Sequence, residues 1–337
     1  MALFEDCEPA KACSGARAIS SQGGGALPEG AETLLREFLG PHRRLGSVTE
    51  LSLKRMVRDH CEKFIALDDH GNPAAFVIVS PESHPDVVSD AAQRAVDERG
   101  ALGERLGANV LTPFRVAVSD GRSYSIFAYC RPLSGRRLFG GLERRLLAPK
   151  VLRWLEEAVV FSRKSVDANS LDRRVVQPLR AIEDDSALDT VIRRAAATAL
   201  DDVRSERWHP STVATHNDLW WGNLVHGLST TGASPEFYVI DWGGGDPAGT
   251  PIGDLVRLSM SLGLSPRRCG LWIDRHRRTL DCRPVDVLGY LLIGFGALSL
   301  NRREWPAERF LQATHACFRY ASEAIDTRAR RSSLRSF

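Results

Sequence analysis

The 337-residue sequence lacks the features of several large protein classes. Its net charge is only +3, with 45 Lys and Arg against 42 Asp and Glu, so it shows no charge excess suited to nucleic acid or an anionic membrane surface. Its seven cysteines include no C-x-x-C pair, which disfavours a zinc site or a disulfide framework and fits a reducing cytoplasm. No apolar run approaches the roughly 20 residues of a membrane span. We therefore expect a cytoplasmic protein with no nucleic-acid or membrane partner.

What is present is typical of a globular chain with two lobes. The sequence is 43% hydrophobic and 26% charged, and its length allows two buried cores. Residues 1–30 include a Gly-, Ser- and Ala-rich stretch and no apolar signal core, which predicts a disordered head and not a secretory peptide. We expect an N-lobe over residues 31–133 and a C-lobe over residues 134–337.

The predicted N-lobe alternates strands and helices. Period-two patterns and turn residues predict an antiparallel sheet flanked by helices. A helix begins near Pro28, and a second is expected over Ser89–Leu106, with Ala92, Val96, Leu102 and Leu106 on its buried side. The expected strands are Val48–Val57, Lys63–Leu67, Ala74–Val79, Phe114–Val118 and Tyr124–Tyr129.

The predicted C-lobe is mainly helical, with two short strands embedded in it. Long helical patterns cover Leu146–Ser165, Ala187–Val203, Val285–Leu300 and Pro306–Asp326. The strands are expected around Leu224–Val225 and Phe237–Ile240. Together the two lobes predict an α+β protein.

The strongest functional signal is the run from Thr215 to Val225, which has the form H-x-D-x-x-x-x-N. Asp241 follows at the end of an apolar strand-like run. Phosphoryl transfer requires a carboxylate that orients the acceptor hydroxyl and takes its proton, and oxygen ligands that hold Mg²⁺ against the phosphates. Asp218 is therefore the predicted catalytic base. Asn223 and Asp241 are the predicted metal ligands, because Mg²⁺ prefers hard oxygen donors.

This segment resembles the aminoglycoside phosphotransferase and choline kinase superfamily, whose loop reads H-G/N-D-x-x-x-x-N and whose metal motif reads I-D-W/F. The run Gly249–Leu255 is similar to the family's G-x-P-x-x-D-L-A segment. The resemblance implies a bilobal protein-kinase-like fold, with a small antiparallel-sheet N-lobe and a larger, mainly helical C-lobe. It also implies that Asp254 opens a helix and supports the catalytic loop. His216 is expected to pack this loop as a structural residue.

The resemblance further implies a site for ATP or GTP, with one departure. Glu98 stands where the family places the partner of a third-strand Lys. The third strand, Ala74–Ser80, contains no Lys or Arg. A basic residue of a neighbouring segment, Lys54, Arg58 or Lys63, would then reach the phosphates. Alternatively, the nucleotide site is degenerate and the protein binds a ligand without turnover.

Two further groups of residues are candidate ligand contacts. The segment containing Ala128, Tyr129 and Cys130 resembles the adenine-binding hinge, where main-chain groups bond the purine edge. Trp220, Trp221 and Trp242 are candidates for the acceptor pocket, and core packing is the alternative. The three tryptophans could form an aromatic cage for a quaternary ammonium. An acidic set that includes Asp201 and Asp202 could instead attract a polycation, although such runs more often form a solvated face or a helix cap.

The sequence thus predicts an ATP- and Mg²⁺-dependent O-phosphotransferase that acts on a hydroxyl of a small molecule, an antibiotic or a metabolite. The alternative is a non-catalytic kinase-like binding protein. Protein kinase activity is disfavoured because Asp241-Trp242-Gly243 replaces D-F-G and no A-P-E follows. The acceptor and the oligomeric state stay open.

Overall fold

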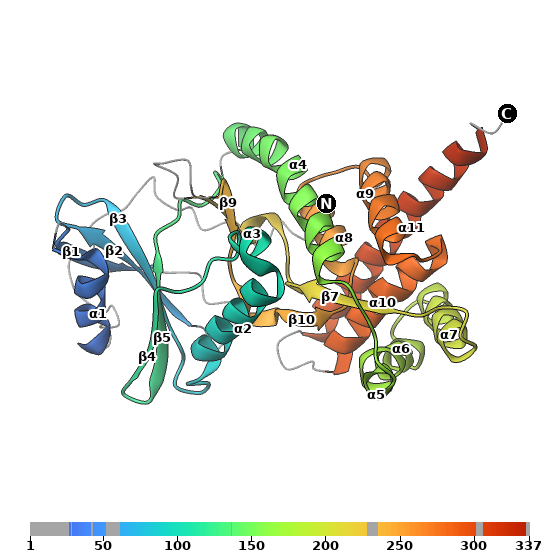
Figure 1. Cartoon of the computed structure of the whole chain (residues 1–337), viewed down its shortest axis with the longest axis horizontal. Helices are drawn as coiled ribbons and strands as arrows, with labels where there is room; N and C mark the ends of the chain where they lie inside the picture. Colours follow the sequence, from blue (N-terminus) through green and yellow to red (C-terminus); the bar gives the residue numbers. More distant parts are fainter. Residues whose placement is uncertain are drawn as a thin grey trace. The chain divides into compact units, whose positions relative to one another are not determined.

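A computed structural model describes residues 27, 29–41, 43–51, 61–135, 137–227, 235–300 and 306–334. The described residues divide into two compact units (Figure 1). Unit 1 contains Gly141–Trp221 and Gly245–Phe337, and unit 2 contains the residues up to Gly140 together with Gly222–Gly244. The N-lobe was expected to end near residue 133, whereas unit 2 also includes the later segment Gly222–Gly244. The expected disordered head lies almost entirely outside the described residues.

Unit 2 is built on a five-stranded antiparallel sheet, as the sequence predicted. The strand order is β1-β2-β3-β5-β4. The strands are β1 (Leu45–Glu50), β2 (Glu62–Asp68), β3 (Pro73–Val79), β4 (Arg115–Ser119) and β5 (Arg122–Ala128). The helices are α1 (Glu29–Leu39), α2 (Val87–Ala101) and α3 (Gly103–Gly107). A separate hairpin, β8 (Leu224–His226) with β9 (Phe237–Val239), also belongs to this unit.

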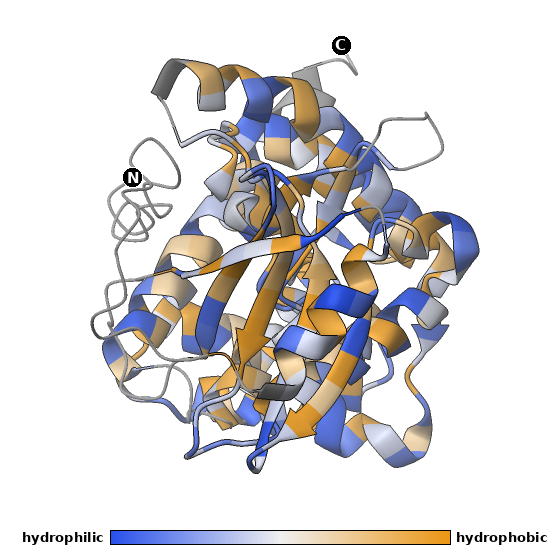
Figure 2. Cartoon of the chain, turned by 90° about the vertical axis from the view of Figure 1, so that its left-hand side faces the viewer, coloured by the Kyte–Doolittle hydropathy of each residue, from blue (hydrophilic) through white to orange (hydrophobic). Residues whose placement is uncertain are grey.

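Helix α1 covers one face of the five-stranded sheet. Ala31 and Leu35 of the helix are fully buried in one core cluster with Phe64, Val77 and Val79. Side chains alternate between the faces of a strand, so these residues define the α1 face. Figure 2 shows the apolar (orange) stretches along the strands.

Helix α2 packs on the opposite face. The backbone N–H of Ser89 donates to Ser123 Oγ over 3.3 Å, and the Ser123 hydroxyl donates to the carbonyl of Pro85. Ser123 precedes Tyr124 of the α1-face core, so it points to the other side of the sheet. Ala92 is buried as expected, whereas Val96 is 50% exposed, contrary to the prediction. The buried stripe of α2 instead passes through Ala95 and Glu98, which have helical spacing from Ala92.

Unit 1 is mainly helical. Helix α4 begins in unit 2 and continues into unit 1. The helices are α4 (Arg137–Ser162), α5 (Ala168–Leu171), α6 (Gln177–Glu183), α7 (Thr190–Arg204), α8 (Gly253–Ser261), α9 (Pro266–Leu280), α10 (Pro284–Leu300) and α11 (Ala307–Leu334), with a π-helical turn at Asp172–Val176. A small sheet has the order β10-β7-β6, and its strands are β6 (Lys164–Ser165), β7 (Ser211–Thr215) and β10 (Asp246–Gly249).

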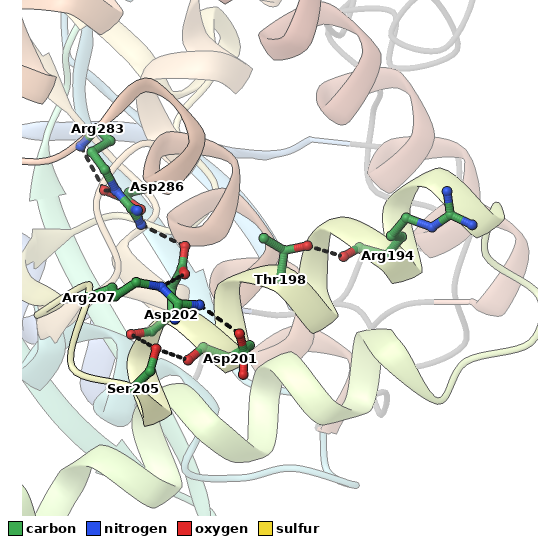
Figure 3. A network of polar contacts seen from close by, with 8 residues as sticks. All are labelled: Arg194, Thr198, Asp201, Asp202, Ser205, Arg207, Arg283 and Asp286. Carbon is green, nitrogen blue, oxygen red and sulfur yellow. Dashed lines mark hydrogen bonds and ion pairs between the residues drawn. The ribbon is translucent and has the colours of Figure 1, made fainter.

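A buried ion network joins α7 to the start of α10 within unit 1 (Figure 3). Arg283 donates to Asp202 over 2.7 Å and to both carboxylate oxygens of Asp286. Arg207 donates to Asp202 over 2.7 Å and to Asp201 over 2.6 Å. Burial by itself raises the pKa of Asp202, but the hydrogen bonds and charges of the two arginines outweigh it and hold that pKa below its usual value. Asp201 and Asp202 thus serve this network.

Among the described residues, no single helix is long and apolar enough to span a membrane. Helices α9 and α10 reach that length and composition only as a pair, across a 92° bend.

Candidate functional site

The predicted catalytic loop leaves a fully buried strand. Every residue of β7, Ser211–Thr215, is buried, and the strand pairs with β10. The approach is so close that a Cβ on Gly249 would lie 1.9 Å from Thr215 Oγ1. Only glycine fits there, which explains the first residue of the run Gly249–Leu255. The loop that follows β7 is therefore anchored at a fixed point of unit 1.

The loop adopts a backbone conformation that few residue types tolerate. Asn217, immediately before Asp218, has a φ of 62°, in the left-handed region where asparagine is enriched. Ile252, the N-cap residue of α8, has a φ of 81°, which is strained for a β-branched side chain. Such strain persists only where the surrounding structure enforces it, as it does at many active sites. Both residues flank the segments that carry Asp218 and Asp254.

Asp254 ties the loop to the start of α8. Its carboxylate accepts the backbone N–H groups of His216 over 2.7 Å, of Asn217 over 3.3 Å and of Leu219 over 3.3 Å. His216 is 2% exposed, and its Nδ1 accepts the backbone N–H of Asp218 over 3.3 Å. Because a backbone N–H can only donate, this Nδ1 is unprotonated. These contacts suit the supporting roles predicted for His216 and Asp254.

Arg257 is a site residue that the sequence analysis missed. It lies three residues after Asp254 on α8, and its guanidinium donates to the carbonyl of Asn217 over 2.8 Å and to the carboxylate of Asp218. The Arg257 side chain is 10% exposed, while that of Asp218 is 45% exposed. Ser261, one turn further along α8, accepts the N–H of Trp221 over 3.0 Å. The i, i+3, i+7 spacing of these polar residues on α8 was the available signal.

The two predicted metal ligands lie at the same end of the β8–β9 hairpin in unit 2. Leu224 pairs with Val239, and the N–H of Ile240 donates to the carbonyl of Asn223 over 3.0 Å. Asn223 is therefore the acceptor of this hydrogen bond, and Asp241 directly follows its donor. Asp241 has a φ of 66°, again in the left-handed region. An amide and a carboxylate oxygen fit Mg²⁺, which takes one or two protein oxygens together with water and phosphate.

Helix α2 packs against the segment that follows Asp241. Arg94 donates to the carbonyl of Gly243, and a Cβ on Gly243 would lie 3.9 Å from Ala91. Glu98 lies four residues after Arg94 on this side of α2 and is fully buried. A carboxylate removed from water needs compensating charge or hydrogen bonds. Glu98 lies in the interior of unit 2, on the side of the helix that meets the Asp241 segment, and its carboxylate needs such compensation there.

Of the three basic residues predicted to contact the phosphates, the structure describes one. Lys54 and Arg58 lie outside the described residues. Lys63 is on β2, where it pairs with Ile78 of β3. Val77 and Val79 of β3 are fully buried on the α1 face, so neither is the position of a lysine that faces α2.

The predicted hinge follows β5. The N–H of Tyr129 donates to the carbonyl of Ala74 over 3.1 Å, so this amide is not the group that would bond a purine. Cys130 is buried, which raises the pKa of its thiol to about 11 and keeps it neutral. Ala128 pairs with Ala75 of β3. The hinge is thus a direct continuation of β5, which lies beside β3 in the interior of the five-stranded sheet.

The three tryptophans are divided between the two units. Trp220 and Trp221 lie edge to face in unit 1, with ring centroids 5.9 Å apart, and the Arg144 guanidinium lies 4.9 Å from the Trp221 ring centroid. Trp242 is 3% exposed in unit 2 and donates its indole N–H to the carbonyl of Val239 over 3.0 Å. Trp242 is therefore a core residue, the alternative that the sequence left open. The assignment of Trp220 and Trp221 to an acceptor pocket stays a prediction.

The predicted chemistry is divided between the two units. Unit 1 carries Asp218 and the α8 side chains that hold its loop, and unit 2 carries Asn223, Asp241 and Glu98. Within the described part of the chain, no three His, Cys, Asp or Glu side chains form a cluster that could bind a metal by themselves. Asn223 and Asp241 would accordingly hold Mg²⁺ only together with water and phosphate oxygens.

No protein-family model matches the chain, and no curated protein matches it in sequence. Solved structures do. A thermostable mutant of the aminoglycoside phosphotransferase APH(4)-Ia has a TM-score of 0.50 at 12% identity, covering 88% of this chain and 99% of its own. The choline kinase LicA from Streptococcus pneumoniae has 0.49 at 13%, with coverages of 87% and 99%. A protein described as a fructosamine-3-kinase of Thermobifida fusca has 0.47 at 18%, with coverages of 88% and 98%.

Proposed function

We propose that this chain, whose protein-kinase-like fold was predicted from its sequence and is similar to that of an aminoglycoside phosphotransferase, is an ATP- and Mg²⁺-dependent O-phosphotransferase that acts on a hydroxyl of a small molecule. Asp218 would orient the acceptor hydroxyl and accept its proton. Asn223 and Asp241 would hold Mg²⁺, which would neutralise charge on the transferred phosphate. In such reactions the protein contributes mainly positioning and electrostatic stabilisation.

One observation carries this proposal: the loop bearing Asp218 is held by a dedicated set of contacts. Asp254 accepts three backbone N–H groups of the loop, and Arg257 binds both a loop carbonyl and the Asp218 carboxylate. The Asp218 side chain is nevertheless 45% exposed. A carboxylate that is fixed in orientation and still open to solvent is suited to a catalytic base.

The second candidate is a non-catalytic kinase-like protein with a degenerate nucleotide site, which binds a ligand without turnover. It is favoured by the absence of Lys and Arg from β3, residues Pro73–Val79. Loss of a phosphate-binding cation removes transition-state stabilisation that commonly amounts to several kcal/mol. The two candidates therefore differ in turnover.

The test begins with nucleotide binding by the full-length protein. Calorimetry with ATP and with GTP, each with and without Mg²⁺, should show Mg²⁺-dependent binding. Phosphate transfer is then measured with a panel of aminoglycosides, macrolides, amino alcohols, aminosugars and fructosamines. At least one acceptor should be phosphorylated, and Asp218→Asn should lower kcat at least about 100-fold while nucleotide affinity is unchanged.

Asp189→Asn is the matched control, because Asp189 is an exposed aspartate of unit 1 with a side chain 75% exposed. It should keep full activity. Nucleotide binding without transfer to any acceptor would favour the non-catalytic candidate. Failure to bind either nucleotide with Mg²⁺ would sink the enzyme and leave the non-catalytic candidate.

A further inference from the structure

The sheet of unit 2 carries a lysine beside the strand that lacks one. Lys63 of β2 pairs directly with Ile78 of β3, and Ile78 pairs in turn with Ser125 of β5. Side chains of paired residues in adjacent antiparallel strands point to the same face, with Cβ atoms about 5 Å apart. The Lys63 side chain therefore starts one strand away from β3, at the same level as Ile78.

This is the α2 face of the sheet. Val77 and Val79, which flank Ile78, are buried in the core beneath α1, so Ile78 points the other way. Ser125 precedes Ile126 of the same α1-face core and likewise points away from α1. Ser123, which shares the face of Ser125, contacts the start of α2. Lys63 is thus on the side of the sheet where the Glu98 helix packs.

The charges of Lys63 and Asp241 both act on one thiol of unit 2. Cys61 lies two residues before Lys63, directly ahead of β2. The pKa of the Cys61 thiol is raised chiefly by burial, is lowered by the charge of Lys63 and is raised by the charge of Asp241. One half-buried thiol therefore lies within electrostatic range of both charged groups. All three residues belong to unit 2.

Lys63 is also available to bind a ligand. Lys63 is half-buried. Within the described ranges, its ammonium makes no hydrogen bond or ion pair with another side chain. By contrast, the neighbouring cation on this edge, Arg122, is held by Glu62 over 3.0 Å and by the carbonyl of Ser80 over 2.5 Å. A half-buried lysine in the unit that also carries Asp241 supplies the kind of charge needed by a triphosphate bound with Mg²⁺.

We propose that Lys63 contacts the phosphates of the bound nucleotide and replaces the lysine that β3 lacks. This inference rests on the proposed function and assigns to β2 the cation that the sequence analysis could not place. The vacated position is Ile78, because Ile78 is the β3 residue that faces α2 at the level of Lys63.

The experiment compares nucleotide binding by the full-length protein and six variants, two of which, Lys54→Met and Arg58→Met, test the other candidate cations. Lys63→Met should weaken Mg²⁺·ATP binding about 10- to 100-fold, the loss of one charge-assisted contact, and should leave adenosine binding unchanged. The double variant Lys63→Met with Ile78→Lys restores a lysine one strand away and should recover most of this loss. Lys63→Arg keeps the charge and should retain most of the affinity. Lys164→Met, an exposed lysine of unit 1, is the control and should bind as wild type.

Three results would be decisive. If wild type binds Mg²⁺·ATP and Lys63→Met binds it equally well, Lys63 is not the phosphate ligand, although the proposed function stands. If Lys54→Met or Arg58→Met shows the phosphate-specific loss instead, the cation comes from that segment and the inference is overturned. If wild type binds no nucleotide, the proposed function itself fails. Rescue by the double variant separates a lost contact from a folding defect.

Discussion

Arg257 donates hydrogen bonds to the carboxylate of Asp218 and to the carbonyl of Asn217. One guanidinium therefore fixes both the side chain of the predicted base and the backbone immediately before it. A planar fork can make both bonds at once, whereas a lysine ammonium is a single point charge. The pair commits one carboxylate oxygen, Oδ1 of Asp218.

We therefore expect Arg257→Ala and Arg257→Lys to lower kcat about 10- to 100-fold with a smaller change in the KM for ATP. The reason is that the base loses its orientation while the nucleotide-binding unit is unaltered. The control is Arg275→Ala, which removes a 49% exposed arginine paired with Glu156 and should leave kcat unchanged. Full activity in Arg257→Ala would show that Asp218 is oriented by other groups.

The division of the site between two units predicts a separation of binding from chemistry. Asp241→Asn and Asn223→Ala should weaken Mg²⁺-dependent ATP binding at least about tenfold, because the first removes the negative charge of one ligand and the second removes a hard oxygen ligand. Asp218→Asn should bind Mg²⁺·ATP as wild type does. Titration calorimetry at several Mg²⁺ concentrations measures the difference, with Asp90→Asn on the exposed side of α2 as the control. Equal effects of all these changes on binding would contradict this division.

The ion network of α7 and α10 predicts a large effect on stability and none on the site. Arg283→Met leaves the buried carboxylates of Asp202 and Asp286, whose side chains are 8% and 4% exposed, without a main partner. Arg283 is 45% exposed and Asp202 keeps its contact with Arg207, so the expected loss is about 1–3 kcal/mol, the usual cost of removing one partner of a buried hydrogen-bonded group. Urea unfolding should show a loss of this order, while Arg36→Met, which breaks an exposed pair with Glu32, should cost less than about 0.5 kcal/mol. A small loss in Arg283→Met would mean that Arg207 suffices for the network.

His276 predicts how stability depends on acid. It is buried, and burial lowers its pKa to about 4, although its Nδ1 lies 3.0 Å from the carbonyl of Trp272. The unfolded chain, with a histidine pKa near 6.5, binds a proton between pH 6.5 and pH 4 that the folded chain does not bind. The free energy of unfolding should therefore fall as pH is lowered through this range, by up to about 3 kcal/mol from this residue.

Unfolding measured at pH 6.5, 5.5 and 4.5 tests this sign. His276→Gln should flatten the pH dependence, whatever its effect on stability at pH 7. His70→Gln, at a side chain 79% exposed, should leave the slope of wild type unchanged. An unaltered slope in His276→Gln would assign the acid sensitivity to other groups.

The sequence by itself determined the class of fold and the identities of the motif residues. Strand and helix periodicity predicted the sheet of unit 2 and most long helices, because a half-buried strand and an amphipathic helix each repeat their apolar residues at a fixed spacing. It also singled out Asp218, Asn223, Asp241 and Asp254, because their residue types occur at informative spacings. Short elements such as β7 and β10 escaped it, because four or five residues are too few for a period to be recognised.

Tertiary structure alone decided which residues meet. Arg257 reaches Asp218 because α8 folds back on a loop nearly forty residues earlier. The spacing on α8 puts Arg257 on the face of Asp254, but it does not show that this face meets Asp218. Trp242 is a core residue and not a pocket residue because it is buried, and its burial depends on packing and not on residue type. The place of Lys63 was set by strand register, since only the pairing of β2 with β3 puts its side chain beside Ile78 on the α2 face. Residue types are written in the sequence, but the neighbours of a side chain depend on long-range packing.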